Sequence, residues 1–465
     1  MERIIKPERP AGFIDYNTEY FLARESMVNK ISKVFRSFGY NPIETPLAEF
    51  LKTLVGTDET SKNIFSLRSL NSSSGDDDIA LRFDHTVPFA RFLAANPYNK
   101  ENQSGIKLPW RRSVYGPVFR GDTPQKGRFR QFYQFDIDVA GSSSMLADAE
   151  IVAVIYNTLK ELSISNFVIK VNNRKILNGF IDLLNIKKRG EISANEIAME
   201  IMRILDKIQK NSWDIVKQEL AQKPVNKFDV SPGLIKEDIV KIERFLRLQG
   251  SNDEKITQCF SLFSGIKIAE DGLTELRKML EFLSCQTVDL DYVKIDFSVA
   301  RGLDYYTGPV FETFINSALE FGSIFSGGRY DELFSRFTGK KLPAVGASIG
   351  VDRFFSVLNH LNLLNLKQKK VADVIILRLS DDDKFIQDYL FFADSLRKLG
   401  VNAEISLLEN KDFSAQFNFA ISQSYNYALI FGEREREKNV VVIKDLIKRE
   451  QKELKFSEFN NFFKS

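Results

Sequence analysis

The densest group of chemically useful side chains lies between residues 119 and 138, FRGDTPQKGRFRQFYQFDID. Basic side chains flank a loop that contains Gly121, Pro124 and Gly127; they are Arg120, Lys126, Arg128 and Arg130. Arginine offers fixed, paired donors to phosphate, and glycine lets backbone N–H groups approach a ligand. The loop therefore predicts an anion site, and a solvated hairpin with charged edges is the alternative.

Acceptor side chains follow this loop at every second position. Gln134, Asp136 and Asp138 fall on one face if the segment is a strand, because side chains alternate along a strand. Phosphate-binding groups that lead into such acceptors indicate a site for both an anion and a cationic small molecule.

A second set of acceptors stands in LRFDHTVPFAR, residues 81 to 91. On a strand, Asp84 and Thr86 share a face and would hold an ammonium group by charge-assisted hydrogen bonds. His85 then points the other way, and we expect it to be a packing residue rather than a ligand-binding one.

Glycine-rich segments carry the remaining candidates. PAVGASIGVDRFFSVL, residues 343 to 358, is a small-residue strand that runs into a helix with Arg353 in its first turn. SGGRYDEL, residues 326 to 333, and ARGLDYYTGPVFE, residues 300 to 312, place polar and aromatic residues beside glycines. Neither GxGxxG nor GxxxxGK[ST] occurs, which disfavours a Rossmann or P-loop nucleotide site.

Composition limits the class of protein. The 465 residues are 43% hydrophobic and 27% charged, which is typical of a globular protein of two or three domains. There is no run of 18 apolar residues and no signal-peptide pattern. Two cysteines and two histidines exclude a disulfide framework and a histidine-rich metal site, and they favour a reducing cytoplasmic compartment. A net charge of +3 permits nucleic-acid binding without arguing for it.

Periodicity predicts the elements that position these residues. We expect a helix over 18–38, a polar turn over 71–78 between two strands, and a strand, basic loop and strand over 114–141. A helix over 146–162 follows, and residues 183–290 read as helical. The tail reads βαβαβ, which predicts a small α/β domain with a mostly parallel sheet.

The order of these segments resembles that of the class II aminoacyl-tRNA synthetases, and within that class the histidyl-tRNA synthetase family. The extended segment with Pro46 looks like the dimer-forming first motif, FRGDTPQKGRFRQF like the second and GASIGVDRFFSVL like the third. RGLDYYTG and SGGRYD resemble the two signatures of the histidine enzymes. The class I signatures, a HIGH-type turn and KMSKS, are absent.

The resemblance implies the fold class. It is an α+β catalytic domain with an antiparallel sheet, interrupted by a helical insertion and followed by an α/β domain of the anticodon-binding type. The implied divisions are 1–182 and 291–364 for the catalytic core, 183–290 for the insertion, 365–371 for a linker and 372–465 for the anticodon-binding domain.

The resemblance also implies an activity. A histidine–tRNA ligase activates L-histidine with ATP and Mg²⁺, without zinc or any other protein-bound metal, and transfers the histidyl group to the 3′ end of tRNA(His). We expect a cytoplasmic homodimer with no membrane or DNA partner.

Roles carry over onto matching positions. Arg120 and Arg301 are the implied catalytic residues on the α-phosphate, and Arg353 is implied to bind the outer phosphates. The implied histidine-binding residues are Asp84, Thr86, Arg120, Gln134, Asp138, Arg301, Tyr305 and Tyr306, and the implied ATP-binding residues are Arg120, Arg128, Arg130 and Arg353.

Some departures and rivals stand beside this interpretation. Tyr133 replaces a histidine common in the family, and DFSAQFNFAISQSY lacks the lysines usual there. The rivals are the synthetase-like regulatory subunit of ATP phosphoribosyltransferase, a class II synthetase for glycine, proline or threonine, and a non-catalytic synthetase-like domain. The α/β tail and the second motif argue against the regulatory subunit. The RGLDYYTG signature argues against the other class II synthetases, and the arginines at 120, 301 and 353 argue against a non-catalytic domain.

Overall fold

The computed structural model describes residues 5–55, 63–68, 78–209, 211–226, 228–300, 305–366, 370–409 and 412–463. By its internal contacts the chain divides into two compact units. One comprises Met1–Ile14 and Met27–Leu363, and the other comprises Asp15–Ser26 and Leu364–Ser465. Among the described helices, none has both the length and the apolar character needed to cross a membrane.

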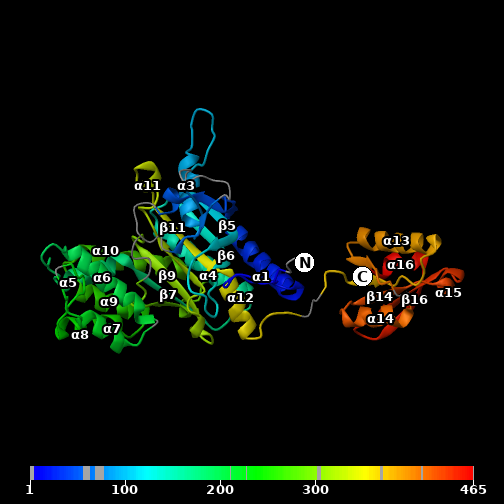
Figure 1. Cartoon of the computed structure of the whole chain (residues 1–465). Helices are drawn as coiled ribbons and strands as arrows, with labels where there is room; N and C mark the ends of the chain where they lie inside the picture. Colours follow the sequence, from blue (N-terminus) through cyan, green and yellow to red (C-terminus); the bar gives the residue numbers. More distant parts are fainter. Residues whose placement is uncertain are drawn as a thin grey trace. The chain divides into compact units, whose positions relative to one another are not determined.

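A mainly antiparallel sheet forms the centre of the first unit (Figure 1). Its inner strands run antiparallel to their neighbours, and only the edge strands β1 and β8 pair in parallel. In the described part of the chain the strand order is β1 (Asn41–Pro42), β5 (Trp110–Phe119), β6 (Gln131–Ala140), β11 (Ala344–Gly350), β10 (Phe325–Arg329), β9 (Pro309–Ile315), β7 (Phe167–Asn173) and β8 (Val293–Ile295). A small sheet contains β2 (Ala48–Phe50), β4 (Ile79–Leu81) and β3 (Ser66–Leu67), in that order. Helix α2 (Leu51–Val55) follows β2 directly along the chain.

Several sequence expectations are confirmed in this part of the chain. The predicted first helix is α1 (Thr18–Ser37), and the strand, basic loop and strand are β5 and β6, in register from Trp110 opposite Ala140 to Phe119 opposite Gln131. Helix α4 (Met145–Glu161) follows, capped by Ser144, whose hydroxyl accepts a hydrogen bond from the Leu146 N–H at 3.2 Å. Of the predicted polar turn, residues 71–77 lie outside the described part of the chain.

The expectation of one strand through Asp84 and Thr86 is wrong. β4 ends at Leu81, and α3 (Thr86–Ala95) begins where alternation was expected to continue. The apolar run fits both periods, and the helix prevails because Val87, Phe89, Ala90 and Leu93 all become buried. Pro88 is tolerated because it stands in the first helical turn.

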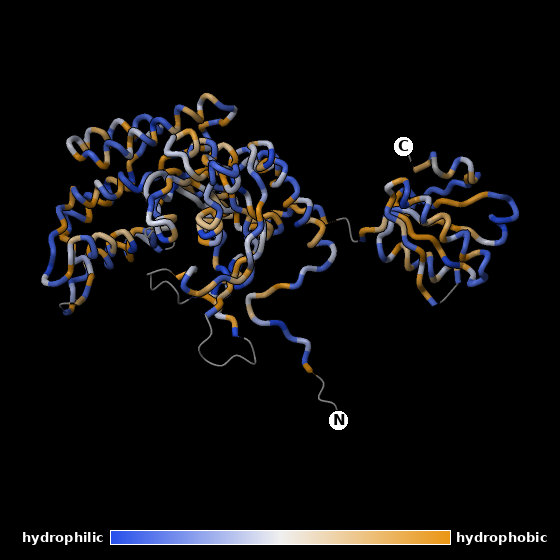
Figure 2. The backbone as a smooth tube through the Cα atoms, turned by 90° about the horizontal axis from the view of Figure 1, so that it is seen from above, coloured by the Kyte–Doolittle hydropathy of each residue, from blue (hydrophilic) through white to orange (hydrophobic). Residues whose placement is uncertain are grey.

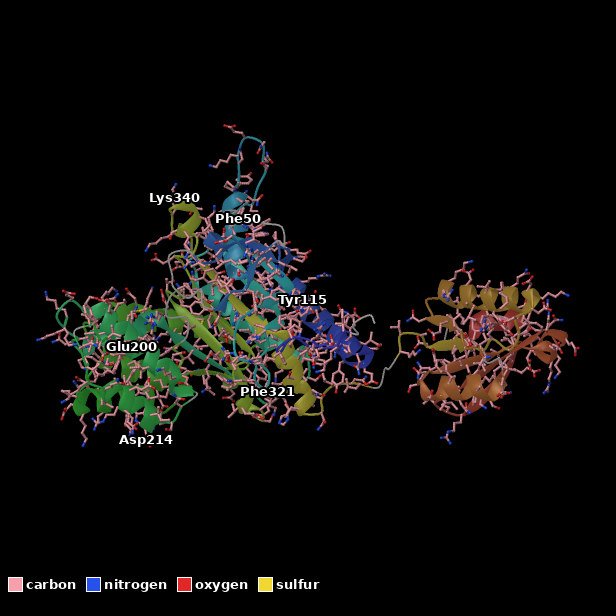
Figure 3. All side chains as sticks on the ribbon, viewed as in Figure 1. Phe50, Tyr115, Glu200, Asp214, Phe321 and Lys340 are labelled. Atoms are coloured by element: carbon pink, nitrogen blue, oxygen red, sulfur yellow. The ribbon has the colours of Figure 1, made fainter. Side chains whose placement is uncertain are left out.

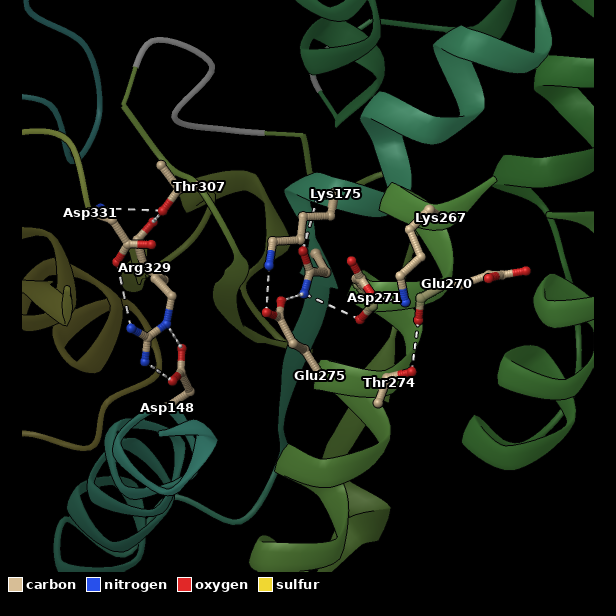
Figure 4. A network of polar contacts seen from close by, with 12 residues as sticks. Asp148, Lys175, Lys267, Glu270, Asp271, Thr274, Glu275, Thr307, Arg329 and Asp331 are labelled. Atoms are coloured by element: carbon tan, nitrogen blue, oxygen red, sulfur yellow. Dashed lines mark hydrogen bonds and ion pairs between the residues drawn. The ribbon is translucent and has the colours of Figure 1, made fainter. Parts of the chain in front are cut away.

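A helical segment follows β7 (Figure 1). Its helices bury apolar side chains such as Ile176 and Leu273. Phe180 stacks on Phe245 with ring centroids 4.4 Å apart, and Lys175 pairs with Glu275 at 2.5 Å, as Figure 4 shows. These contacts join the first of the helices, which follows β7 directly, to two later ones. The helices are α5 (Arg174–Leu183), α6 (Ala194–Asp206), α7 (Trp213–Ala221), α8 (Lys236–Leu246), α9 (Asn252–Leu262) and α10 (Lys267–Ser284).

The chain then returns to the sheet. Short 3₁₀ turns precede β8 and β10, at Leu290–Tyr292 and Leu319–Phe321, and a third 3₁₀ turn, Lys207–Gln209, follows α6. Helix α11 (Ser335–Thr338) leads to β11, and α12 (Val351–His360) follows that strand directly. The predicted small-residue strand running into a helix is therefore confirmed.

The second unit contains a five-stranded sheet in its described residues, ordered β13 (Ala403–Ile405), β12 (Val374–Ile376), β14 (Tyr427–Ile430), β15 (Val440–Asp445) and β16 (Glu450–Lys455). Figure 2 shows hydrophobic residues concentrated along these strands. Its helices are α13 (Asp383–Lys398), α14 (Phe413–Ser422), α15 (Glu433–Glu437) and α16 (Phe456–Phe462).

The prediction of a mostly parallel sheet in this unit is wrong. β12 pairs in parallel with β13 and β14, whereas β14 with β15 and β15 with β16 are antiparallel. A parallel connection needs a crossover of a dozen or more residues, and α15 spans only Glu433–Glu437. The chain therefore turns back, and the hairpin strand β16 was not predicted.

Candidate active site

Side chains from distant parts of the first unit line one cavity of about 800 Å³. Its volume lies within the range of ordinary small-molecule sites. Among its lining residues, Phe321 (labelled in Figure 3) belongs to the 3₁₀ turn that precedes β10. The cavity brings together most residues proposed from sequence: Asp84, Thr86, Arg120, Arg128, Gln134, Asp138, Tyr305, Tyr306 and Arg353.

Asp138 sits at the acidic end of the cavity and is 3% exposed. Its carboxylate pairs with the Arg112 guanidinium at 2.6 Å and accepts a hydrogen bond from the Tyr330 hydroxyl. Burial raises the pKa of Asp138, and Arg112 and Tyr330 act against that rise. The carboxylate is therefore fixed in place before any ligand arrives.

Sequence reasoning gave no role to Arg112 or Tyr330. Arg112 lies directly opposite Asp138 in the register of β5 and β6, which only strand pairing reveals. Tyr330 belongs to the quoted SGGRYDEL segment, but nothing in that segment indicates its reach to Asp138.

Glycines make room for these side chains. A Cβ atom on Gly346, which pairs with Asp138 in register, would lie 2.0 Å from the Asp138 Oδ1 atom. A Cβ atom on Gly328 would lie 2.9 Å from Cδ1 of Tyr306. Heavy atoms cannot approach so closely, so both positions must be glycine.

The middle of the β6 wall holds Gln134 and Asp136. As predicted, they share a face with Asp138, and all three line the cavity. The Gln134 Nε2 atom donates to the Ser348 hydroxyl at 2.8 Å, while its Oε1 atom is buried without a hydrogen-bond partner. Burial raises the pKa of Asp136 to about 7; Arg112 lowers that pKa and Asp138 raises it.

Asp84 and Thr86 reach the same cavity from the start of α3 rather than from a strand. Asp84 Oδ1 accepts from the Val87 N–H at 3.1 Å, which fixes the carboxylate at the helix N-terminus. Burial raises the pKa of Asp84, and Arg120 opposes the rise. A helix terminus thus achieves the shared orientation that a strand was expected to give.

His85 is buried, with Nε2 3.2 Å from the Gly116 carbonyl oxygen. Burial lowers its pKa to about 3, and Arg82 and Arg112 lower it further. The histidine is therefore a neutral packing residue, as expected.

Basic side chains line the cavity as well. Arg120 Nε donates to the Phe83 carbonyl at 3.0 Å, and Arg353 Nη1 donates to the Ser323 carbonyl at 2.9 Å. Arg128 pairs with Asp122 at 2.8 Å. Arg130 is not among the lining residues, and its Nε atom donates to the Asp122 carbonyl at 3.1 Å.

Two adjacent tyrosines complete the lining. The Tyr305 hydroxyl donates to the Tyr306 hydroxyl at 3.1 Å, and Tyr305 is 38% exposed. Arg301 and Asp304, which precede them, lie outside the described residues. Over the described ranges, no group of three or more histidine, cysteine or acidic residues is arranged to hold a metal ion.

The cavity therefore holds side chains of both charges. Asp136 and Asp138 act on the pKa of Tyr306, and Arg353 and Phe321 both lie beside Gly127. Such a cavity is complementary to a cationic molecule joined to, or lying beside, a polyanion.

Comparisons with known proteins agree on one family. The sequence profile of histidyl-tRNA synthetase matches residues 12–354, and that of the anticodon binding domain matches residues 373–465. The histidine–tRNA ligase of Wolinella succinogenes is 34% identical over 453 residues, which cover 97% of this chain and 96% of that protein. The same enzyme of Rhizobium meliloti is 35% identical over 464 residues, covering 95% of this chain and 88% of that protein.

Solved structures give the same result. The crystal structure of histidyl-tRNA synthetase from a Nostoc species superposes with a TM-score of 0.82 at 30% identity and covers 99% of both chains. A Bacillus halodurans structure described as an ATP phosphoribosyltransferase regulatory subunit/histidyl-tRNA synthetase has a TM-score of 0.69 at 23% identity and covers 90% of this chain and 97% of that one. The second likeness shows the fold alone.

Proposed function

The chain belongs to the histidyl-tRNA synthetase family of class II aminoacyl-tRNA synthetases, and we propose that this cavity is its histidine-activation site. The protein is a histidine–tRNA ligase, and the family acts on histidine, ATP with Mg²⁺ and tRNA(His). One observation carries the proposal, namely that carboxylate and guanidinium side chains together line one cavity of about 800 Å³.

The reaction has two steps. The histidine carboxylate attacks the α-phosphorus of ATP, which forms histidyl-adenylate and releases pyrophosphate. A ribose hydroxyl of the terminal tRNA adenosine then attacks the carboxyl carbon and releases AMP. The first step needs positioning and charge neutralisation more than covalent help from the protein.

The acidic part of the cavity would bind the amino acid. We assign Asp84, Thr86 and Gln134 to the α-ammonium group, because each presents an acceptor to the cavity from a fixed backbone position. Asp138 and Tyr306 would contact the imidazole nitrogens, and Tyr305 would line the same pocket. A pocket with buried polar groups rejects an apolar isostere, because those groups would be left unpaired.

The basic part would bind the nucleotide. Arg120 would contact the α-phosphate and the histidine carboxylate, and Arg353 the outer phosphates. Arg128 lines the same part of the cavity, and Arg130 would act from behind the loop. Arg301 stays a sequence-based prediction for the second α-phosphate contact.

The remaining proposals concern organisation. We propose a cytoplasmic homodimer that uses no zinc, with the catalytic core at 1–182 and 291–364, the insertion at 183–290, the linker at 365–371 and the anticodon-binding domain at 372–465. The regulatory-subunit alternative is not favoured, because relatives named histidine–tRNA ligase match over nearly the whole chain.

Histidine-dependent ATP–pyrophosphate exchange tests the proposal. We expect exchange with histidine and not with proline or glycine. Arg120→Ala and Arg301→Ala should each lower kcat by about 100-fold or more, because each removes a charged contact to the reacting phosphate.

Arg277→Ala is the matched control. Arg277 is exposed on α10 and lies against the Phe260 ring, outside the cavity. Its loss should leave exchange within about twofold of the unaltered protein. Equal exchange with proline or glycine, or full activity in Arg120→Ala, would contradict the assignment.

A further inference from the structure

The short segment before β10, residues 319–323, lines the cavity next to its basic side chains. It consists of the 3₁₀ turn Leu319–Phe321 and the two residues that follow, and we call it the 319–323 turn. Phe321, labelled in Figure 3, is only 6% exposed although it belongs to the cavity lining. Its ring is therefore covered by contacts with neighbouring side chains.

The first of these contacts is with the tip of the basic loop between β5 and β6. The Lys126 Nζ atom lies 4.5 Å from the centroid of the Phe321 ring. Gly127 has a φ angle of +69°, and a Cβ atom there would lie 3.1 Å from Cδ1 of Phe321. The tip is itself closed, because the N–H groups of Gln125 and Arg128 each donate to the other residue's carbonyl, at 3.1 and 2.9 Å. The ring thus packs directly on a defined loop tip.

The second contact is with α12, the helix that carries Arg353. The Arg353 Nη1 atom donates to the Ser323 carbonyl at 2.9 Å, and its Nε atom lies 3.3 Å from the Gly127 carbonyl, to which it donates. At the other end of α12, the His360 ring lies 5.4 Å from the Phe321 ring between centroids. The 319–323 turn therefore holds the loop tip against Arg353.

The aromatic ring leaves the charge of Lys126 uncompensated. Arg128, in the same loop, pairs with the Asp122 carboxylate at 2.8 Å. Lys126 forms no ion pair with any carboxylate in the described part of the chain. The face of an aromatic ring attracts an ammonium group but carries no net charge. Phe321 can therefore orient Lys126 and still leave its positive charge to an anion in the cavity.

We propose that Phe321 is a positioning residue that holds Lys126 for binding to the outer phosphates of ATP, next to Arg353. The inference rests on the proposed function, which assigns Arg353 to those phosphates. It adds Lys126 as a phosphate-binding residue and gives the Phe321 ring a role in the reaction. Two cations from different elements would then share the charge of the departing pyrophosphate.

The test uses the full chain in histidine-dependent ATP–pyrophosphate exchange, with KM measured separately for ATP, pyrophosphate and histidine. Lys126→Ala should raise KM for ATP and for pyrophosphate about tenfold, because it removes a charged contact to phosphate. Phe321→Ala should raise the same two constants about fivefold, because the lysine loses its cation–π contact. In both variants KM for histidine should stay within about twofold, and kcat should change little.

Two further variants separate the role of the ring from packing. Phe321→Leu keeps an apolar side chain but has no aromatic face, so it should raise KM for ATP nearly as much as Phe321→Ala. The double variant Phe321→Ala/Lys126→Ala should stay within about twofold of Lys126→Ala alone, because the ring acts through the lysine. Recovery with leucine together with additive losses in the double variant would show that the ring serves packing only.

Phe263→Ala is the matched control for a general loss of packing. Phe263 follows α9, is 0% exposed and lies 5.6 Å from the Phe245 ring between centroids, outside the cavity lining. Its truncation should lower the urea midpoint of unfolding at least as much as Phe321→Ala. KM for ATP should nevertheless stay within about twofold of the unaltered protein.

Each outcome decides one question. An unchanged KM for ATP in Lys126→Ala, or an equal rise in KM for histidine, would overturn this inference and leave the proposed function standing. Unchanged exchange with a raised KM for tRNA(His) in aminoacylation would place Lys126 on a tRNA phosphate and would also overturn it. No histidine-dependent exchange in the unaltered protein would refute the proposed function, and this inference with it. If Phe321→Ala fails to fold, Phe321→Leu and Lys126→Ala decide.

Discussion

The two large sheets use their buried positions differently. The sheet of the first unit places Gln134, Asp136 and Asp138 on buried positions of one strand, where Gln134 Oε1 and Asp136 Oδ1 have no hydrogen-bond partner. The sheet of the second unit fills its core with apolar side chains such as Val374 and Leu429. Burying unpaired polar atoms costs stability, whereas burying apolar surface provides it.

The two units therefore obtain their stability from different kinds of contact. In the first unit, polar positions are tolerated because neighbours fix them, as Arg112 and Tyr330 fix Asp138. Arg329 and Asp148, drawn in Figure 4, form a second buried pair. Apolar helices such as α4 then supply the packing. We expect substitutions in the first sheet to affect activity first, and those in the second to affect stability alone.

The largest expected effect comes from substituting Gly346. Gly346→Ala places a Cβ atom 2.0 Å from Asp138 Oδ1, so the carboxylate must move and histidine should bind at least about 100-fold more weakly. The KM for histidine in pyrophosphate exchange measures this. Gly350→Ala on the same strand meets only the Arg353 Cβ atom at 3.6 Å, and a comparable loss there would argue against a special role for Gly346.

Breaking the buried Asp138 pair should cost both activity and stability. Asp138→Ala leaves the Arg112 guanidinium, which is 0% exposed, without its carboxylate, and we expect about 3–5 kcal/mol less free energy of unfolding. Urea denaturation measures this. Asp271→Ala removes an exposed partner of Lys267, drawn in Figure 4, and should leave the free energy of unfolding almost unchanged; equal costs would show that burial is not the cause.

In the second unit, Phe392→Ala should separate stability from activity. Phe392 is 1% exposed and packs against Phe431, Phe456 and Phe459, so its truncation should lower the free energy of unfolding by about 3 kcal/mol. Pyrophosphate exchange should stay within about twofold. The adjacent Phe391→Ala, at a position 60% exposed, serves as the control, and lost exchange in Phe392→Ala alone would contradict the separation.

The smallest expected effect is a gain of stability. The pKa of Asp136 is about 7 when folded and near 3.8 when unfolded, so the native state binds more protons between these values and stability falls as pH rises through them. Asp136→Asn removes this cost and should raise the free energy of unfolding by about 1–3 kcal/mol at pH 8. At pH 4 the gain should nearly vanish. Urea denaturation at both pH values measures this, and a gain independent of pH would point to packing instead.

Local pattern was sufficient for much of the fold. Strand alternation placed Gln134, Asp136 and Asp138 on one face, and the small-residue strand before Arg353 became β11 and α12. It failed at Asp84 and Thr86, where a short apolar run satisfied both periods and burial chose the helix. It also failed in the second unit, where the short α15 decided strand direction.

By itself, the sequence determined the fold class, the family and most of the side chains that line the cavity, because periodicity and motif order are properties of the chain. Only the tertiary structure decided that Arg112 and Tyr330 hold Asp138, that Gly346 must be glycine, and that Ser348 accepts a hydrogen bond from Gln134. These relations depend on the register between strands far apart in the chain. Register is set by the packing of the whole sheet, which no local pattern encodes.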